Sequence, residues 1–380
     1  MRYLTHLLVL LLVVIWVIPT VGLFVSSVRD KDQLAISGWW TALSSSQQNL
    51  MARSVGPDKQ RRDGEVYVLE GNVFADTSGN SNGGTGVISA FGWQAQKPTA
   101  FKAGDIAEMR KGQIMTVQSD GSYRLTSPTP WKGKRGKRVF HTAKVAPRFT
   151  LDNYKEVLDA EGIGKAFLNS LTVTIPATVI PILIAAFAAY ALAWMQFPGR
   201  ALLVAVIVGL LVVPLQMSLI PLLRMYNSVG LFLGADSKTY LGIWLAHTGF
   251  GLPLAIYLLR NYIAGLPKEI MDSARVDGAT HFKIFVSIVL PLSFPALASF
   301  AIFQFLWVWN DLLIAMVFLG NTEEQLVLTG RLREMLGSRG GNWEILTASA
   351  FVTIIVPLLV FFSLQRYLVR GLLAGSVKGG

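Results

Sequence analysis

The chain has 380 residues, of which 52% are hydrophobic and only 15% are charged, whereas about a quarter of the residues of an ordinary soluble protein are charged. The sequence has no cysteine, which excludes disulfides, thiolate metal sites and a thiol nucleophile. The net charge of +11 is shared between the segment Arg29 to Lys165, with 20 Lys and Arg against 14 Asp and Glu, and the remainder. Neither share is large enough to indicate a nucleic-acid partner.

Six stretches are long and apolar enough to cross a bilayer, which takes about 20 mostly apolar residues in a helix. In chain order they are Leu4 to Phe24, about Phe167 to Met195, Ala201 to Leu223, Tyr240 to Leu259, Leu292 to Phe318 and Ile345 to Leu364. The first is longer than the apolar core of a cleaved secretory signal, so we interpret it as a retained anchor. The sequence therefore predicts an all-α polytopic membrane protein with six transmembrane helices.

The basic residues of the short loops predict the orientation, because Lys and Arg are retained on the cytoplasmic side. With the amino terminus inside, nine Lys and Arg lie in inner segments and five lie in or beside the short outer loops. This asymmetry favours both termini in the cytoplasm. The 137 residues from Arg29 to Lys165 then lie outside.

The outer segment contains runs bounded by turn residues, which predict strands. The runs are GEVYVLEGNVF, GQIMTVQ and RVFHTAKV, with the turn sequences SDGSY and SGNSNGG between them. We expect a small β-rich extracytoplasmic domain inserted between the first two transmembrane helices. The stretch from about Gly38 to Gln60 is less periodic and is expected to be helical or irregular.

The predicted organisation has four parts. They are a transmembrane helix at 1–28, the inserted domain at 29–165, a five-helix membrane core at 166–370 and a cytoplasmic tail at 371–380. The core contains a cytoplasmic segment at 265–291.

This segment has the start and stop signals of two short helices; its sequence is GLPKEIMDSARVDGATHFKIFVSIVLP. Pro267 suits a first helical turn, and Glu269 favours the positive end of the helix dipole. Gly278 can adopt a positive φ that ends the helix, and Thr280 can cap the next one. A bent element of this kind fits a groove on a partner protein; the alternative is an ordinary solvated loop.

The spacing in this segment resembles the EAA motif of permease subunits of bacterial ABC importers, Glu-Ala-Ala-x3-Gly-x9-Ile-x-Leu-Pro. The matching positions are Asp272, Ser273, Ala274, Gly278, Ile288, Leu290 and Pro291. Asp272 stands where the motif has Glu, and Ser273 stands where it has Ala. The resemblance implies that these residues, together with Glu269, couple the chain to an ATPase.

Other stretches resemble carbohydrate permeases of the maltose type. They are RFTLDNYKEVL, VPLQMSLIPLLRMYNSVGLFL, GFGLPLAIYLLRNYIAGLPKEI and the tail QRYLVRGLLAGSVKGG. The sequences DSARVDGATHFKIF and SFPALASFAIFQFLWVWNDLL, together with a large first outer loop, are most similar to the second permease subunit of α-glucoside importers.

The resemblance implies the type I ABC importer permease fold in a bacterial inner (plasma) membrane, with the insert periplasmic or extracellular. The implied partners are a second permease subunit in a heterodimer, two cytoplasmic ABC ATPases, an extracytoplasmic sugar-binding protein and membrane lipid. ATP and Mg would be used by the ATPases, and no cofactor is expected on this chain. In agreement, the sequence has no Gly-x4-Gly-Lys-Ser/Thr phosphate loop.

Polar residues in the third and fifth spans are candidates for the substrate pathway, because a polar residue at membrane depth usually faces a pathway or a partner. Gln304, Trp307 and Asp311 recur at helical spacing on one face, with Asn310 beside Asp311, and Gln216 follows Pro214 in the third span. Acceptors beside an aromatic ring suit a sugar. A structural role is the alternative and ranks first for Asn310 and Asp311; for Gln216 it is an interhelical hydrogen bond.

Two other functions are weighed against the importer subunit. An ATP-independent secondary transporter or channel is compatible with six spans, but it has no need of a coupling motif. A membrane enzyme is the other alternative, but the sequence offers no cluster of catalytic or metal-binding residues for it. The four histidines are scattered without metal-ligand spacing: His6, His141, His247 and His281. We therefore assign no catalytic and no metal residues.

The insert could help to dock the binding protein or could be a spacer, and we rank docking slightly higher. Its basic run contains Lys132, Lys134, Arg135, Lys137 and Arg138. The run could meet an acidic protein or lipid headgroups, and solvated surface is the favoured interpretation.

Overall fold

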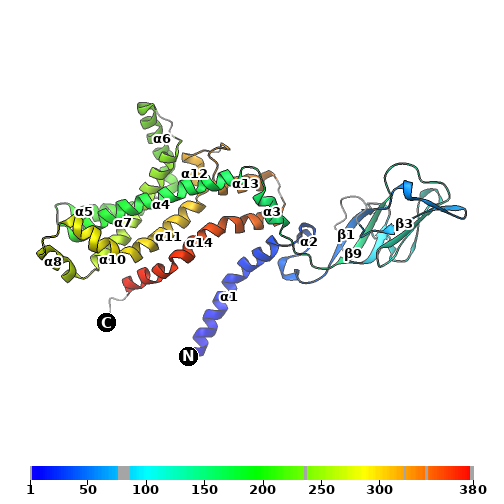
Figure 1. Cartoon of the computed structure of the whole chain (residues 1–380), viewed down its shortest axis with the longest axis horizontal. Helices are drawn as coiled ribbons and strands as arrows, with labels where there is room; N and C mark the ends of the chain where they lie inside the picture. Colours follow the sequence, from blue (N-terminus) through cyan, green and yellow to red (C-terminus); the bar gives the residue numbers. More distant parts are fainter. Residues whose placement is uncertain (1, 76–85, 235–237, 321, 339–340, 377–380) are drawn as a thin grey trace. The chain divides into compact units, whose positions relative to one another are not determined.

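The computed structural model describes residues 2–75, 86–234, 238–320, 322–338 and 341–376 (Figure 1). The turn sequence SGNSNGG and the last four residues of the expected tail lie outside these ranges. The chain forms two compact units. One contains residues 1–154 and 342–348, and the other contains residues 155–341 and 349–380.

The first unit begins with the apolar helix α1 (Arg2–Ser27) and the short helix α2 (Lys31–Ile36). Asp30 caps α2 by accepting a hydrogen bond from the backbone N–H of Asp32 at 3.0 Å. Short 3-10 turns follow at Trp39–Thr41, Pro57–Lys59 and Arg110–Gly112.

Two antiparallel sheets form the rest of this unit in the described residues. The strands are β1 (Ser46–Arg53), β2 (Arg61–Asp63), β3 (Val66–Asn72), β4 (Gly86–Gly92), β5 (Phe101–Lys102), β6 (Ile106–Glu108), β7 (Ile114–Val117), β8 (Ser122–Ser127) and β9 (Arg138–Val145). One sheet has the order β1-β9-β4-β5 and the other β2-β3-β8-β7-β6. Phe91 and Val139 from the first sheet share one buried cluster with Leu69, Met115 and Leu125 from the second. The sheets therefore pack face to face.

Strand β1 corrects the expectation of helix or irregular chain between Gly38 and Gln60. Its eight residues pair with β9 over their whole length, from Ser46 opposite Val145 to Arg53 opposite Arg138. The strand is mostly polar because only Gln48 and Ala52 turn fully inward. Its pairing partner β9 lies 85 or more positions further along the sequence. The strand is therefore stabilised by distant residues, which the local pattern of apolar residues does not reveal.

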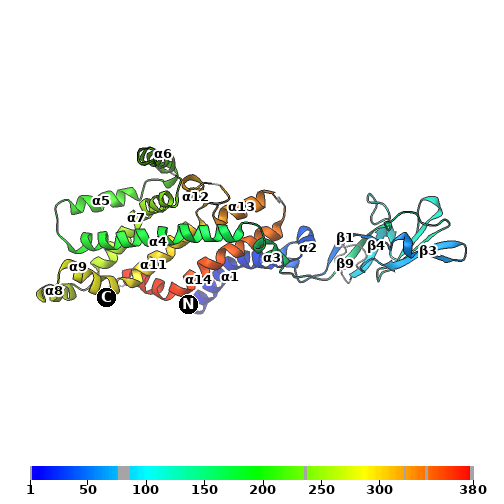
Figure 2. The same cartoon turned by 45° about the horizontal axis from the view of Figure 1, so that its top comes forward.

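The second unit is helical; α3 and the first residues of α14 lie at the boundary and belong in part to the first unit. The helices are α3 (Asp152–Leu158), α4 (Ile163–Trp194), α5 (Arg200–Leu210), α6 (Leu215–Leu233), α7 (Tyr240–Ala264), α8 (Lys268–Val276), α9 (His281–Ile284), α10 (Leu290–Leu292), α11 (Phe294–Asn310), α12 (Leu312–Phe318), α13 (Leu328–Ser338) and α14 (Trp343–Ser376), with a π-helical turn at Phe285–Val289. Helix α4 packs along α7 and α11, whereas α6 projects away from them (Figures 1 and 2).

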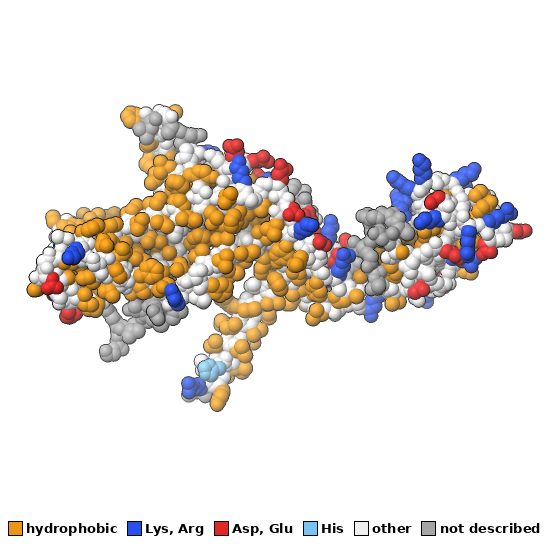
Figure 3. Space-filling model, viewed as in Figure 1, with side chains coloured by type: hydrophobic (Ala, Val, Ile, Leu, Met, Phe, Trp, Pro, Cys, Tyr) orange, Lys and Arg blue, Asp and Glu red, His pale blue; other side chains and the backbone are white. Residues whose placement is uncertain are grey.

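In the described part of the chain, four helices are long and apolar enough to cross a membrane: α1, α4, α7 and α14 up to Leu368. Two further pairs pass only if each is counted as one bent span. They are α5 with α6 up to Phe232, bent by 107°, and His281–Leu292 with α11, bent by 69°. Figure 3 shows hydrophobic side chains covering the visible face of these helices, and charged side chains gathering over the strands.

The third predicted span, Ala201 to Leu223, is therefore wrong as one continuous helix. Helix α5 ends at Leu210, and α6 begins after Pro214. Proline has no N–H to donate and keeps the preceding residue out of the helical region, so the chain turns at this point.

Candidate functional site

Residues 265–291, named the coupling segment after the predicted role, contain helices α8 and α9 joined at Gly278. Gly278 has φ +75°, as predicted from the sequence. Its N–H donates to the carbonyl of Arg275 at 3.0 Å, and the N–H of Ala279 donates to the carbonyl of Ala274 at 2.9 Å. These two bonds form a Schellman motif, which satisfies the last carbonyls of α8 and favours glycine at the turn.

The second half of the segment begins at Thr280, whose hydroxyl caps α9 by accepting from the N–H of Lys283 at 3.4 Å. The π-helical turn follows, in which the N–H of Leu290 reaches back five residues to Phe285. Pro291 comes next and has no N–H to continue the regular ladder. Ile288 and Leu290 are half-buried and pack against the helical core.

Buried contacts attach the segment to the ends of α4 and α7. Met271 is 1% exposed and packs in one cluster with Tyr190 and Ile263. The hydroxyl of Tyr190 shares a hydrogen bond with Nδ1 of His281 at 3.0 Å. The indole N–H of Trp194 donates to the carbonyl of Ile263 at 3.0 Å, so the same region also joins α4 to α7.

Arg275 provides a second attachment. It donates to the carboxylate of Asp272 at 3.1 Å and to the carbonyl of Trp194 at 3.4 Å. Asp272 thus stabilises α8 within its own turn and orients the guanidinium toward α4. Ser273 and Ala274 contribute backbone carbonyls to the end of α8, bonded to Asp277 and Ala279.

The coupling segment exposes apolar side chains that have no covering partner in the described residues. Val276 is 88% exposed, Phe282 is 68% exposed and Ile270 is 41% exposed, with the exposed Glu269 in the same helix as Ile270. Exposed apolar residues beside charged ones are typical of a surface that docks onto another protein.

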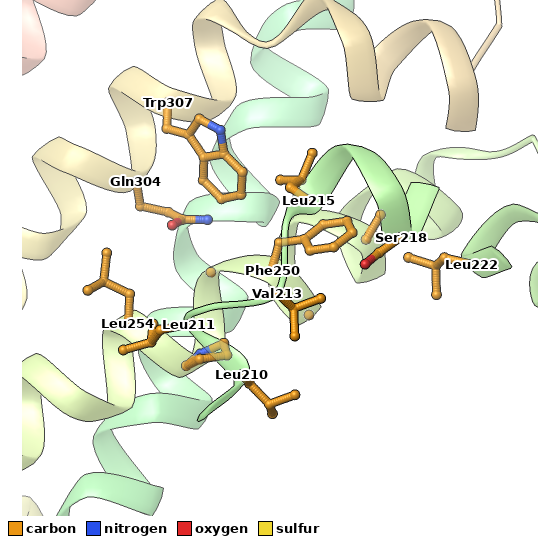
Figure 4. A pocket seen from close by; sticks show the side chains of 14 residues that line it. Leu210, Leu211, Val213, Leu215, Ser218, Leu222, Phe250, Leu254, Gln304 and Trp307 are labelled. Atoms are coloured by element: carbon orange, nitrogen blue, oxygen red, sulfur yellow. The ribbon is translucent and has the colours of Figure 1, made fainter. Parts of the chain in front are cut away.

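A cavity of about 480 Å³ lies among α5, α6, α7 and α11 (Figure 4). Its walls are mostly apolar. Gln304 and Trp307 point into it from α11, toward Phe250 and Leu215, and Ser218 faces it from α6. The cavity thus combines aromatic and aliphatic walls with a few polar groups, which is the usual make-up of a small-molecule site.

Gln304 also has a structural role. It is 3% exposed, and its amide donates to the carbonyl of Ala177 in α4 at 3.1 Å. Gly251 in α7 makes room for it, since a Cβ there would stand 2.7 Å from Oε1 of Gln304. This close approach links the three central helices at one level.

The predicted helical face of Gln304, Trp307 and Asp311 is wrong at its last residue. Helix α11 ends at Asn310, and Asp311 has ψ 92°. The carboxylate of Asp311 instead accepts from the N–H of Ile314 at 3.0 Å and caps α12, and the amide of Asn310 donates to the carbonyl of Leu306. A capping carboxylate competes with helix continuation, which accounts for the break.

Gln216 lies exposed in the first turn of α6 and is not among the residues that line the cavity. Two polar residues were not among the predicted pathway residues: Ser218, which lines the cavity, and His247, which contacts the cavity residue Trp307. His247 is 0% exposed with its ring 5.2 Å from the ring of Trp307, and neither ring nitrogen has a hydrogen-bond partner among the described residues. A histidine within an apolar span was the available signal.

The described residues contain no group of three or more His, Asp or Glu side chains that could hold a metal ion.

Comparisons with known proteins give consistent matches. A family model described as "Binding-protein-dependent transport system inner membrane component" matches residues 166–373. The alpha-glucoside transport system permease protein AglG of Rhizobium meliloti is 69% identical over 376 residues, which cover 99% of this chain and 97% of that protein. The osmoprotective compounds uptake permease protein GgtD of Synechocystis is 62% identical over 231 residues, 61% of this chain and 76% of that protein.

A crystal structure of a bacterial ABC transporter involved in the import of the acidic polysaccharide alginate contains a chain that is 23% identical, with a TM-score of 0.49. The match covers 59% of this chain and 81% of that one. Because the match to the Rhizobium protein includes 376 of the 380 residues, it extends through the inserted sheets as well as the helices.

Proposed function

Because the chain belongs to the inner-membrane components of binding-protein-dependent transport systems and is a permease subunit of a sugar ABC importer, we propose that it carries α-glucosides. The support for this substrate class is the 69% identity to the alpha-glucoside permease over almost the whole chain. The chain is a transport subunit and not an enzyme; ATP is hydrolysed on a separate subunit.

The observation that carries the mechanism is the attachment of the coupling segment to two membrane helices. Tyr190 and Trp194 at the end of α4 bond to His281 and Arg275, and Trp194 also bonds to Ile263 at the end of α7. A displacement of α8 and α9 would therefore move α4 and α7 together. We propose that ATPase closure drives this displacement.

The surface that would meet the ATPase consists of the exposed residues of the coupling segment, with Val276, Phe282 and Glu269. Burying exposed apolar side chains in a cleft supplies binding free energy of about 1.5–3 kcal/mol for each large side chain. In the proposed complex, ATP and Mg bind to two ATPase subunits, and the segment fits into a groove on one of them.

The chain would form half of the pathway, with a second permease subunit as the other half. Helix α6 supports this arrangement: it projects from the bundle with Met217, Leu231 and Phe232 at least 75% exposed. Such a face, on a helix that also exposes Arg224, suits a protein partner better than lipid alone.

The cavity is the proposed segment of the sugar pathway on this subunit. Gln304 and Ser218 would meet hydroxyl groups, and Trp307 would meet the apolar face of a sugar ring. Gln216, Asn310 and Asp311 would not contact the sugar there; Asp311 would maintain the bend between α11 and α12.

The proposed topology has both termini in the cytoplasm, the coupling segment on the same side, and the insert, residues 29–165, on the outer side with the sugar-binding protein. Six spans follow if each bent pair crosses once. The support is the excess of Lys and Arg in the inner short loops.

Affinity purification of the tagged chain from its native membrane tests the assembly. A second permease and an ABC ATPase should co-purify, and vesicles containing the complex should accumulate α-glucoside only with ATP and the binding protein. Purification of a lone oligomer that moves sugar in ATP-free vesicles would instead establish a secondary transporter.

A further inference from the structure

The basic run of the insert forms one wall of a pocket. The pocket has a volume of about 290 Å³ and is lined by Arg53, Pro57, Leu69, Trp131, Lys132, Arg135, Gly136, Lys137 and Arg138. Five of these nine residues are cationic, and none is acidic. The three apolar residues give the pocket a packed base, since Leu69, Trp131 and Pro57 are buried.

The backbone around the pocket is fixed by the sheet. The N–H of Ser54 donates to the carbonyl of Lys137, and the N–H of Lys137 donates to the Ser54 hydroxyl, both at 2.8 Å. Gly136 lies so close to the Ser54 carbonyl that a Cβ there would clash with it. The loop that carries the cations is therefore held against the end of β1.

Trp131 fixes the other end of that loop. Its backbone N–H donates to the side-chain oxygen of Gln60 at 2.8 Å, and the Gln60 amide donates to the Trp131 carbonyl at 3.3 Å. Lys137 places its ammonium 5.2 Å from the centre of the indole ring. The ammonium of Lys137 is thus placed by a side-chain contact, and the backbone of Arg138 is placed by β9, opposite Arg53.

Four of the five cations of the pocket form no ion pair with a carboxylate in the described residues. In the described residues, Lys132, Arg135, Lys137 and Arg138 take part in none of the ion pairs, whereas Arg61 and Arg124 in the other sheet pair with Glu70 and Asp63. Gathering like charges around a concave surface raises the electrostatic potential there and favours an anion.

We propose that this pocket binds a phosphate-class oxyanion. Guanidinium groups match the oxygens of phosphate in a bidentate fork, and ammonium groups add charge without directional demand. A concave pocket with a packed base selects a compact, multiply charged group over the extended carboxylate surface of an acidic protein. The group is either a free phosphate or the headgroup phosphate of an anionic lipid, and the chemistry of recognition is the same.

The test uses the assembled transporter in nanodiscs and two matched triple variants. The pocket variant is Lys132→Gln, Arg135→Gln and Lys137→Gln. The control variant removes the same charge from the same domain at exposed positions outside the pocket: Lys102→Gln, Arg110→Gln and Lys144→Gln.

In phosphatidylcholine nanodiscs, equilibrium binding of radiolabelled inorganic phosphate reports a free anion. In nanodiscs with photoreactive phosphatidylglycerol, cross-linking to the insert reports a headgroup. One bound phosphate per chain, weakened about tenfold or more in the pocket variant only, assigns the site to free phosphate. Cross-linking lost in the pocket variant only, without binding of free phosphate, assigns it to lipid.

Two results would overturn the proposal. The first is that neither probe binds; if the pocket variant alone then loses affinity for the sugar-binding protein, the surface is assigned to a protein contact. The second is equal loss of binding in both variants, which would mean a diffuse charge effect.

Discussion

Gly251 sets the distance between α7 and α11 beside the cavity. A methyl group at this position would press on the Gln304 amide and displace it from the Ala177 carbonyl. Because the amide is buried, the displaced group would lose a hydrogen bond that water does not replace.

We expect Gly251→Ala to reduce the free energy of unfolding by about 1–3 kcal/mol. Gly249→Ala in the same helix is the control, because its Cβ would meet no atom within 4 Å. Denaturant titration of the purified chain in detergent measures both. Equal stability of the two variants would mean that Gln304 moves aside without cost.

His141 makes the insert sensitive to pH. The residue is 2% exposed in β9, and its ring meets that of Phe74 at 5.8 Å. Burial lowers the pKa of His141, and a weaker effect of the Val139 backbone opposes this. The folded state therefore holds the ring neutral at a pH where the unfolded chain already binds a proton.

The stability that depends on the neutral ring is fully present above about pH 6.5, the ordinary value for histidine, and is lost as the pH falls toward the lowered folded pKa. The slope for one group is at most about 1.4 kcal/mol per pH unit. Hydrogen exchange of β9 amides in the full chain should therefore accelerate, at most about tenfold per unit, once corrected for intrinsic exchange. His141→Leu should remove this dependence; an unchanged slope would assign it to another group.

For single residues, the sequence correctly predicted the conformations that depend on neighbours in the chain. Gly278 and Thr280 occupy the turn and the cap expected from their neighbours in the chain. Asp311 was wrongly predicted to share a helical face with Gln304, because the prediction assumed one continuous helix. The break between α11 and α12 is visible only in the backbone. His247 and Gly251 contact residues of another helix. A single sequence does not show which helices pack together, so these contacts were not predicted.

The bend at Gly278 is the main feature of the coupling segment at the scale of elements. A β-branched residue in the left-handed region is strained, by roughly 1–2 kcal/mol or more. Gly278→Val would open the Schellman turn and change the angle between α8 and α9.

We expect a transporter that contains Gly278→Val to assemble normally, with its ATPase subunits hydrolysing ATP without accumulation of sugar. Gly199→Val is the matched control, because Gly199 also has a positive φ, of +83°, at the start of α5 and meets no atom within 4 Å. Transport and ATPase rates in proteoliposomes give the coupling ratio. Coupled transport by Gly278→Val would count against the proposed role of the bend.

The junction between α1 and the insert is held by Arg29, which is 2% exposed. Its guanidinium donates to the carbonyls of Ser37 and Gly38 and to the Ser37 hydroxyl, each at 2.9 Å. Asn153 closes the junction by donating to the carbonyls of Ser27 and Arg29.

Arg29→Met should loosen this junction by about 2 kcal/mol, because hydrogen bonds to a charged group are lost and carbonyls stay buried. Amide exchange at 30–38 should then accelerate roughly 30-fold. Arg148→Met is the control: the exposed side chain of Arg148 forms a 3.8 Å ion pair with Asp30, and the backbone hydrogen bonds of Arg148 to Asp30 and Gln33 remain in the variant. Similar exchange in both variants would show that the junction does not depend on Arg29.

Elements with a strong apolar pattern were predicted well: α4 covers the second predicted span as far as Trp194, and α7 and α14 contain the fourth and sixth. Strand β9 coincides with the run RVFHTAKV. The break between α5 and α6 was missed, because hydropathy measures composition and does not register the direction of the chain.

At the scale of the whole molecule, the insert is the part whose role depends on its partners. If it docks the sugar-binding protein, replacing Ser37 to Ala146 with a short linker should abolish most uptake and spare basal ATPase activity. Transport assays with and without binding protein measure this. Unchanged uptake would identify the insert as a spacer.

The pairing of β1 with β9 has a consequence for how such a chain changes over generations. The first and last strands of the insert lie side by side, with Ser46 opposite Val145, so the two connections to the helices start from neighbouring points. A domain whose ends adjoin can enter or leave a surface loop without stretching the segments that flank it. A permease with this fold can thus gain or lose the whole two-sheet domain in a single genetic event, while its membrane helices remain unchanged.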